Sequence, residues 1–348
     1  MNVLMSSYLF PPSVGGIETV SWILAHELTR YGARVTVVTR TGSPEPDTTP
    51  FEIVRRPRPA RLVELLRRCD VYFQNNISLN LAWPLAFVRR PWVVALHTWV
   101  TRCNGEQSWQ DRLKQRCLRS ASCISVSRAV ANHIDVPSTV IGNPYDDTQF
   151  VLTPEVARSR DIIFLGRLVS DKGADLLITA LAQLKSRGFQ PTVTIVGTGP
   201  DDHLLKRLAE QEGVSGQIHF AGLRKGSELV RMLNAHRIMV VPSRWQEPFG
   251  VVALEGIACG CVILGAASGG LPDAIGPCGT TFRIGDATDM AKKLEHLLDN
   301  PELMQSYQTS ARRHLAHHKP CVIAARYFDV ISKAAEGRLC IPKSRSLA

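Results

Sequence analysis

Two glutamates frame the strongest chemical signal in the sequence, the run Glu247-Pro-Phe-Gly-Val-Val-Ala-Leu-Glu255. Pro248 suits the first position of a helix, where a backbone N–H group has no intrahelical partner anyway. The N–H groups that follow lie at the helix N-terminus and can bind hydroxyl or phosphate oxygens. These are the amides of Phe249, Gly250 and Val251. Two carboxylates beside such donors favour a polyhydroxylated ligand. The alternative is that Glu247 is a loop charge and Glu255 a buried charge with satisfied contacts.

Two cations occur in a second loop, Gly166-Arg-Leu-Val-Ser-Asp-Lys-Gly173. The loop follows a predicted strand and opens a predicted helix, so Arg167 and Lys172 are expected at the carboxyl edge of a sheet, where α/β proteins bind ligands. An arginine fork and a lysine point charge suit a diphosphate. Taken alone, solvated surface charges would be the simpler explanation. However, the turn Ser268-Gly-Gly-Leu-Pro-Asp273 reaches the same edge, so three loops are predicted to meet at one anion-binding edge.

A further pair of candidates lies in the first half of the chain. The turn Pro12-Ser-Val-Gly15-Gly16 joins the first strand to the first helix, and its glycines let the backbone approach a phosphate closely. The turn lacks the G-x-G-x-x-G fingerprint, and no acidic residue ends the second strand at Thr39-Arg40, which disfavours a nicotinamide cofactor. His97 follows the apolar strand Trp92–Leu96 and is expected to emerge at the ligand cleft. A purely structural histidine is the alternative.

The elements that position these residues alternate between short β-branched strands and amphipathic helices. Strands that are apolar along their whole length, such as Trp92–Leu96, indicate burial on both faces and therefore a parallel sheet. The pattern repeats in the second half, which predicts an α/β protein with two Rossmann-like, doubly wound layers. We expect domains at 1–150 and 151–318. One more helix, predicted at 321–334 within a segment 319–336, follows a helix at 288–299 and has no evident role in the second domain.

Together these residues resemble the GT-B glycosyltransferases, in particular the large retaining family 4. The resemblance extends over nearly the whole chain and rests on short motifs in the same order and spacing. They are Gly15-Gly16, His97, Val126-Ser127, Asn143-Pro144, Gly166-Arg167, Asp171-Lys172, Gly197-Thr-Gly199, Pro242-Ser243, Glu247, Glu255 and Gly269-Gly270. The resemblance implies two Rossmann-like domains that face a cleft, the first on the acceptor side and the second binding a nucleotide-sugar. It also implies that the last helix crosses back to the first domain.

The resemblance further implies an activity: retaining, metal-independent transfer of a hexose-type sugar from a UDP- or GDP-sugar to a hydroxyl of a glycan or lipid-linked acceptor. In this assignment Arg167 and Lys172 neutralise the donor diphosphate, and Glu247 contacts the transferred sugar with the amides of Phe249, Gly250 and Val251. Glu255 holds the ribose and Arg224 lies near the base. Gly15 and Gly16 face the phosphate or sugar, and His97 faces the far side of the sugar. No cofactor or metal is implied. Asp273 stands where the family commonly has Glu.

The composition bears on partners and compartment. The 348 residues carry 41 Lys+Arg and 31 Asp+Glu, a net charge of +10, and nine scattered cysteines that are typical of reduced thiols in the cytoplasm. Neither a signal peptide nor a membrane span is predicted. The basic segment from Arg55 to Arg68, beside an apolar helix face, could rest on anionic lipid at the inner face of the membrane; a solvated surface is the alternative. Nucleic acid is disfavoured, because only 7% of residues are aromatic and no nucleic-acid motif is present.

Two alternative functions stay open at this stage. A GT-B nucleotide-sugar epimerase would use the same donor site but would need no acceptor. A catalytically silent GT-B scaffold is disfavoured, because Arg167, Lys172, Glu247 and Glu255 are all present.

Overall fold

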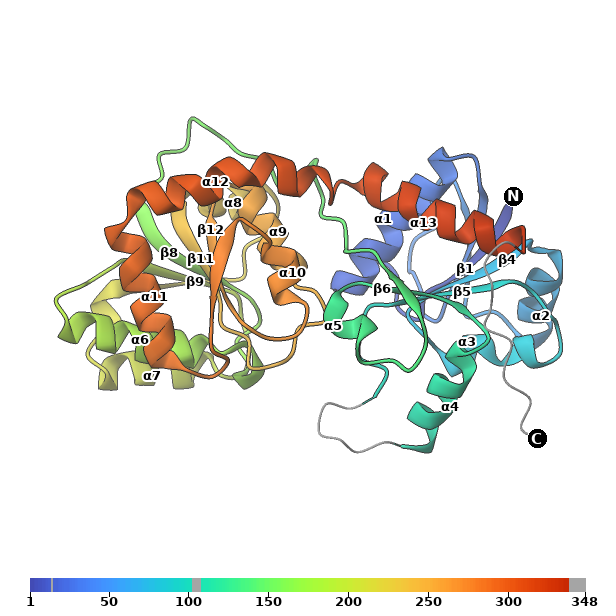
Figure 1. The fold of residues 1–348 in the computed structure, drawn as a ribbon, viewed down its shortest axis with the longest axis horizontal. Coiled ribbons are helices and arrows are strands. Elements are labelled where there is room, and N and C mark those ends of the chain that lie inside the picture. Colours follow the sequence, from blue (N-terminus) through green and yellow to red (C-terminus); the bar gives the residue numbers. More distant parts are fainter. Residues whose placement is uncertain (14, 102–107, 338–348) are drawn as a thin grey trace. The chain divides into compact units, whose positions relative to one another are not determined.

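The chain folds into two compact units, one made of Met1–Pro144 with the C-terminal segment from Pro320, and one made of Tyr145–Lys319. The computed structural model describes residues 1–13, 15–101 and 108–337 (Figure 1). The first boundary follows Pro144, whereas the sequence analysis set it at 150. Tyr145, the first residue after this boundary, bonds within the second unit: its amide donates to the His318 carbonyl at 3.4 Å.

The first unit is a seven-stranded parallel sheet in the order β3-β2-β1-β4-β5-β6-β7. Its strands are β1 (Asn2–Ser6), β2 (Arg34–Thr39), β3 (Glu52–Arg55), β4 (Val71–Asn75), β5 (Trp92–Leu96), β6 (Ser122–Ser125) and β7 (Ser138–Val140). Its helices are α1 (Gly16–Arg30), α2 (Pro59–Arg68), α3 (Leu79–Ala82), η1 (Trp83–Ala86), α4 (Trp109–Leu118), α5 (Arg128–Ala131) and α13 (Pro320–Ala335). All residues of β4 and β5 are buried, as expected for the centre of a parallel sheet covered on both faces.

The second unit is a six-stranded parallel sheet in the order β10-β9-β8-β11-β12-β13. Its strands are β8 (Arg160–Leu165), β9 (Val193–Val196), β10 (Ile218–Gly222), β11 (His236–Val241), β12 (Val262–Ala266) and β13 (Gly279–Phe282). Its helices are η2 (Ser170–Lys172), α6 (Ala174–Ser186), α7 (Asp202–Gln211), η3 (Ser215–Gln217), α8 (Gly226–Ala235), α9 (Val251–Ala258), α10 (Leu271–Ile275), α11 (Ala287–Asp299) and α12 (Pro301–Ala316).

The strand order reverses direction once in each sheet, between β1 and β4 in the first unit and between β8 and β11 in the second. At such a switch point the loops after the two neighbouring strands run to opposite faces of the sheet and leave a crevice at its carboxyl edge. The loops after β8 and β11 contain Arg167, Lys172 and Glu247, and the loop after β1 contains Gly15. The fold therefore brings candidate residues to a switch point in both units.

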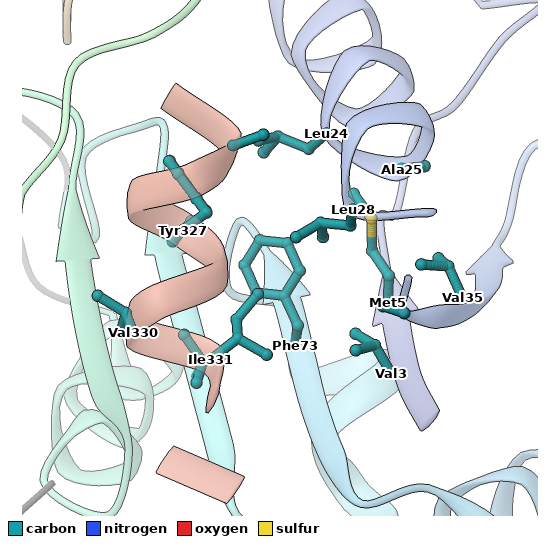
Figure 2. Close-up of a cluster of buried hydrophobic side chains, with 14 of the residues drawn as sticks. Val3, Met5, Leu24, Ala25, Leu28, Val35, Phe73, Tyr327, Val330 and Ile331 are labelled. Atoms are coloured by element: carbon teal, nitrogen blue, oxygen red, sulfur yellow. The ribbon is translucent and has the colours of Figure 1, made fainter. Parts of the chain in front are cut away.

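The last helix, α13, belongs to the core of the first unit. Figure 2 shows Tyr327 and Ile331 of α13 packed beside Phe73 of β4 and Leu28 of α1. The Phe73 and Tyr327 rings meet edge to face with their centroids 5.9 Å apart. This burial explains why the predicted helix at 321–334 has no partner in the second unit.

A long helix, α12, was not predicted from the sequence. It fills the stretch between the predicted helices at 288–299 and 321–334 and lies against α9 and α11. Met304 is its only fully buried residue, but Tyr307, Ala311 and Leu315 follow at helical spacing and are partly buried. The start signal is also present, because Pro301 occupies the first helical turn after Asn300.

The apolar run 249–271 forms α9 and β12 inside the second unit. Among the described residues, no helix combines the length and the apolar character needed to cross a membrane.

Candidate active site

The loop after β8 is fixed by the loop that follows β9. The Gly166 amide donates to the Val196 carbonyl at 3.0 Å, and the Leu168 amide donates to the Thr198 carbonyl at 3.0 Å. A Cβ atom on Gly199 would lie 2.1 Å from the Leu168 carbonyl oxygen, so only glycine permits this close approach. Arg167 is exposed between these anchors and has no acidic partner within the described residues. The backbone at Arg167 is thus held at the sheet edge, and the exposed guanidinium is available to an anion.

Lys172 and Glu247 meet across the switch point of the second sheet. The Lys172 Nζ atom lies 2.5 Å from Glu247 Oε1, and the Ser243 hydroxyl donates to the same carboxylate oxygen at 2.9 Å. Both charged side chains remain partly exposed, at 25% for Lys172 and 17% for Glu247. The structure therefore joins two residues that are far apart in sequence into one charged pair that still faces solvent.

The Glu247 loop is positioned by the two glycines that precede α10. The Gly270 amide donates to the Glu247 carbonyl at 2.7 Å. Gly269 has a φ of +58°, and a Cβ atom there would lie 2.2 Å from the same carbonyl oxygen. The Gly-Gly turn thus supports the loop that carries Glu247, which is a backbone role in addition to any contact with a ligand.

A second support was missed by the sequence analysis. The Arg244 guanidinium binds both carboxylate oxygens of Asp175, on the first turn of α6, at 2.5 and 2.6 Å. The amides of Arg244 and Trp245 also donate to the Asp171 carbonyl, at 2.8 and 3.1 Å. These bonds fasten the loop of Lys172 to the loop of Glu247. No local pattern marks them, because Arg244 and Asp175 are 69 residues apart.

The N-terminus of α9 follows Glu247 directly. Gly250 is its N-cap with a φ of +101°, and the helix begins at Val251. The Phe249 side chain is buried, with its ring 5.6 Å from that of His318. In the described part of the chain, no hydrogen-bond acceptor is found for the three amides that the sequence analysis singled out, those of Phe249, Gly250 and Val251. They are donors without protein partners beside the Glu247 carboxylate.

Glu255 lies one turn further along α9 and is half-buried. Burial raises the pKa of its carboxyl to about 7, and the negative charge of Asp146 adds to the shift. No hydrogen bond or ion pair to the Glu255 carboxyl group is found among the described residues. Its carboxyl is thus neither the satisfied buried charge of the alternative interpretation nor fully ionised at neutral pH.

Arg224 lies apart from this group. It follows β10, pairs with Glu228 at 2.9 Å and donates to the Leu223 carbonyl at 3.3 Å. Next to it, at the ends of β9 and β10, is a cavity of about 550 Å³ whose lining includes Thr198, Gly199, Phe220 and Gly222. The structure shows no contact of Arg224 with Arg167, Lys172 or Glu247.

In the first unit, Gly15 and Gly16 differ in what surrounds them. Gly15 is the N-cap of α1, and a Cβ atom on it would lie 2.5 Å from Glu18 Oε2. Glu18 also accepts a hydrogen bond from the Ser13 hydroxyl at 3.2 Å. Around Gly16 a Cβ atom would meet nothing within 4 Å. Gly15 therefore has a packing reason to be glycine and Gly16 has none. Val14, between this turn's Ser13 and Gly15, lies outside the described residues.

His97 is buried at the end of β5, with Nε2 2.7 Å from Asn75 Oδ1. Asn75 in turn donates to the Ser21 hydroxyl at 2.6 Å, and Ser21 donates to the Ile17 carbonyl in the first turn of α1 at 2.7 Å. Burial lowers the pKa of His97 to about 4, and an interaction with Asn143 opposes the shift. The ring is thus neutral near pH 7 and is linked by hydrogen bonds to the helix that Gly16 begins.

The basic segment from Arg55 to Arg68 departs from expectation. Its apolar residues Leu62, Leu65 and Leu66 are buried in the first unit, so this helix face is not available to a bilayer. Three of its arginines have acidic partners, in the pairs Arg55–Asp47 at 2.6 Å, Arg61–Glu64 at 2.9 Å and Arg68–Glu64 at 2.8 Å. The contact of this basic segment with anionic lipid therefore stays a prediction, and the buried leucines of its helix take no part in it.

Comparison with known proteins identifies the family to which the chain is similar. The model of a family described as Glycosyltransferase Family 4 matches residues 14–149, and that of Glycosyl transferases group 1 matches residues 147–314. A glycogen synthase of Mycobacterium tuberculosis is 27% identical over 318 residues, which are 86% of this chain and 72% of that protein. A GDP-mannose-dependent monoacylated alpha-(1-6)-phosphatidylinositol monomannoside mannosyltransferase of Corynebacterium glutamicum is 25% identical over 353 residues, covering 88% of this chain and 91% of the relative.

Among solved structures, the Anabaena protein HepE in complex with UDP superposes with a TM-score of 0.79 at 20% identity, covering 96% of this chain and all of that one. The two parallel-sheet units are those of the GT-B fold. Two consecutive family models extend from residue 14 to residue 314, and full-length relatives agree with them. The chain therefore belongs to the glycosyltransferases, as a GT-B member of family 4 with a group 1 C-terminal half.

Proposed function

We propose that this glycosyltransferase moves a hexose-type sugar from a UDP- or GDP-sugar to a hydroxyl of a glycan or lipid-linked acceptor, with retention of anomeric configuration and without a metal. The observation that carries the donor assignment is the arrangement at the switch point of the second sheet. There, exposed Arg167 lies on the same loop as Lys172, which is paired with Glu247. Two cations on one loop suit a diphosphate, and a carboxylate beside free helix amides suits sugar hydroxyls.

The proposed chemistry depends on charge that develops on the leaving group. As the bond from the anomeric carbon to the diphosphate breaks, negative charge grows on the phosphate oxygens and positive charge on the sugar ring. Arg167 and Lys172 stabilise the first, because the loop that carries both cations is anchored at the sheet edge before the reaction begins. Glu247 and the amides of Phe249, Gly250 and Val251 orient the sugar. The acceptor hydroxyl attacks from the side of the leaving group, and the diphosphate takes up its proton.

The remaining residues are assigned in the same proposal. Glu255 accepts hydrogen bonds from the ribose hydroxyls, and its ionised form is the stronger acceptor. Gly16 gives a phosphate or sugar close access to the backbone, since its surroundings are open. His97 contributes as a neutral hydrogen-bonding ring. Arg224 is the weakest of these assignments, because its charge is already paired with Glu228.

The nucleotide is the first property to test. HepE binds UDP in its solved complex, and the Corynebacterium relative is named for GDP-mannose, so both bases need comparison. A ligand that binds only the folded state raises the melting temperature. We expect a thermal shift with UDP or GDP that Arg167→Ala and Lys172→Ala reduce. If neither nucleotide shifts the protein, the proposed donor site is wrong.

Products separate the proposal from an epimerase. Incubation with the donor alone should leave the sugar stereochemistry unchanged apart from slow hydrolysis, whereas an epimerase would convert it. Proton NMR of the transferred sugar, recorded early in the reaction, reports whether the anomeric configuration of the donor is kept. An inverted product would contradict retention but not transfer.

A further inference from the structure

Two consecutive asparagines at the end of β4 hold the residue that follows β5. The strands β4 and β5 are neighbours, with Asn75 opposite Ala95, so the residues just beyond both strands meet at the carboxyl edge of the sheet. Asn75 Oδ1 lies 2.7 Å from His97 Nε2. Asn76 Oδ1 accepts hydrogen bonds from the His97 amide at 3.3 Å and from the Thr98 hydroxyl at 3.2 Å. His97 is therefore held twice, by its ring and by its backbone.

Asn76 holds this loop from an unusual backbone conformation. Its φ is +73°, in the left-handed region that residues other than glycine seldom adopt and that asparagine and aspartate tolerate best. Its amide donates to the Ala95 carbonyl at 2.9 Å, which ties the turn to β5. A glycine would adopt this conformation more readily but would supply no oxygen to the His97 loop. The residue type thus meets two demands at once, the bend of the chain and an acceptor for His97.

The hydrogen bonds around Asn75 have only one consistent direction. The Ser21 hydroxyl has a single proton and donates it to the Ile17 carbonyl at 2.7 Å. The Ser7 hydroxyl, 2.8 Å from Ser21 Oγ, has a backbone carbonyl acceptor of its own at 2.6 Å. Ser21 Oγ can therefore only accept from Asn75, which turns the amide NH₂ group toward Ser21 and Oδ1 toward His97. Since Oδ1 cannot donate, the proton between them belongs to His97 Nε2.

This direction decides which nitrogen of His97 carries the proton. With the proton on Nε2, Nδ1 keeps its lone pair, and burial, which lowers the pKa of the ring to about 4, keeps it neutral. The Asn143 side chain also interacts with the ring, but Nδ1 has no hydrogen bond of normal geometry among the described residues. We propose that Asn75 and Asn76 are positioning residues that hold His97 in the Nε2–H tautomer and in one orientation beside the transferred sugar, where it takes no part in proton transfer. The place beside the sugar rests on the proposed function, whereas the tautomer does not.

The tautomer can be measured without substrate. In the full chain labelled with ¹⁵N-histidine, long-range ¹H–¹⁵N spectra distinguish a protonated ring nitrogen from an unprotonated one, and the signals missing from His97→Gln identify His97. We expect a proton on Nε2 and none on Nδ1, and slow exchange of the Nε2 proton with water. Asn75→Leu removes the acceptor at similar volume, so the signal of this proton should move upfield and its exchange should become faster. A proton on Nδ1 in the wild type, or an Nε2–H signal that Asn75→Leu leaves unchanged, would overturn the proposal.

Turnover tests the orientation, with variants of Asn76 that can keep its backbone conformation. Asn76→Gly tolerates the same φ but loses the acceptor oxygen, so it should lower kcat about 10- to 100-fold, the order expected when a group is misplaced by about 1 Å. Asn76→Asp retains Oδ1 and the tolerance for this φ, so it should restore most of the rate. Asn80→Ala, at an exposed position of α3, is the matched control that should change nothing. The UDP or GDP thermal shift should be the same in all of these variants, because the proposed donor residues lie in the second unit.

The outcomes separate this proposal from the proposed function. It is overturned if Asn76→Gly turns over as fast as the wild type, or if Asn76→Asp is as slow as Asn76→Gly. It is also overturned if Asn76→Gly loses the nucleotide thermal shift together with the rate, because Asn76 would then support the fold in general. A wild type that neither shifts with a nucleotide nor transfers a sugar would contradict the proposed function instead, and the tautomer measurement would still decide what Asn75 does to His97.

Discussion

The Lys172 ammonium and the Glu247 carboxylate form an ion pair of 2.5 Å between loops that follow neighbouring strands, β8 and β11. A diphosphate that binds Lys172 must therefore compete with Glu247 for it. Lys172→Ala should weaken UDP or GDP binding about ten- to hundred-fold, as expected for a lost hydrogen bond to a charged group. Glu247→Gln should bind the nucleotide at least as tightly as the wild type, because Lys172 no longer has an ionised partner.

Turnover should separate the two variants further. Since Glu247 is proposed to orient the transferred sugar, Glu247→Gln should lower kcat about 100-fold or more, in the range of lost transition-state hydrogen bonds. Calorimetric titration of the nucleotide together with initial rates makes the comparison. Arg237→Gln, which removes a partner of Asp161 away from the site, serves as a control that should alter neither quantity. Weaker nucleotide binding by Glu247→Gln would show that the ion pair helps to form the site and does not compete with the ligand.

The pKa of Glu255, raised to about 7 mainly by burial, predicts a pH dependence of stability. The folded state holds this proton more tightly than the unfolded state, whose carboxyl titrates near 4.5. The stabilising contribution is therefore complete below pH 4.5 and is lost as the pH rises through about 7. The Gln side chain of Glu255→Gln cannot ionise. The free energy of unfolding of this variant, relative to that of the wild type, should therefore increase as the pH rises from about 5 to about 8. Urea unfolding across this range measures the difference, and parallel curves for the two proteins would contradict the shifted pKa.

Nucleotide binding should depend on the same ionisation of Glu255, but it should favour the ionised carboxylate, whereas folding favours the protonated carboxyl group. If ionised Glu255 accepts hydrogen bonds from the ribose, binding releases a proton near neutral pH, and affinity rises as the pH increases through the pKa of about 7. Calorimetry in two buffers with different ionisation enthalpies detects that proton. Glu255→Gln should bind more weakly and release none.

The two glycine turns should respond differently to alanine. Gly269→Ala places a Cβ atom 2.2 Å from the Glu247 carbonyl oxygen at a positive φ, so it should destabilise the fold by about 1–3 kcal/mol and misplace Glu247. Gly16→Ala has open space around it and should leave the melting temperature nearly unchanged. If a phosphate or sugar approaches this turn, Gly16→Ala should nevertheless lower kcat/KM. Thermal unfolding and kinetics on the same samples distinguish the cases, and full activity of Gly16→Ala would remove Gly16 from the proposed machinery.

The sequence predicted those parts of the fold that local patterns encode. The apolar strand β5 has the predicted ends, because its residues are buried on both faces. Helix α12 was not predicted although the signals for it are present, since Met304, Tyr307, Ala311 and Leu315 recur at helical spacing. Its contact with the rest of the unit depends on polar bonds, such as that of Gln308 to the Gly260 carbonyl at 3.0 Å.

Local patterns also identified most residue types of the site but not the contacts between them. Loops after parallel strands must meet at one edge, which is why Lys172 and Glu247 could be assigned to one site. The bidentate bond between Arg244 and Asp175 has no signature in either loop, because it depends on how β8 and β11 pair. For the same reason the arginines between 55 and 68 looked unpaired in the sequence: Asp47 and Glu52, which neutralise two of them, reach them only through folding.

The proposed absence of a metal requirement rests on Arg167 and Lys172, which together supply the two positive charges that a divalent cation would bring to a leaving diphosphate. Among the described residues no group of three or more His, Cys, Asp or Glu side chains is arranged to hold a metal. We expect the same initial rate after exhaustive treatment with EDTA as with added Mg²⁺ or Mn²⁺. Arg167→Ala provides the internal comparison: with one fixed charge removed, its residual rate should rise when Mg²⁺ is added, whereas that of the wild type should not. If the wild-type rate falls with EDTA and returns with Mn²⁺, then Arg167 and Lys172 do not by themselves stabilise the negative charge on the leaving diphosphate.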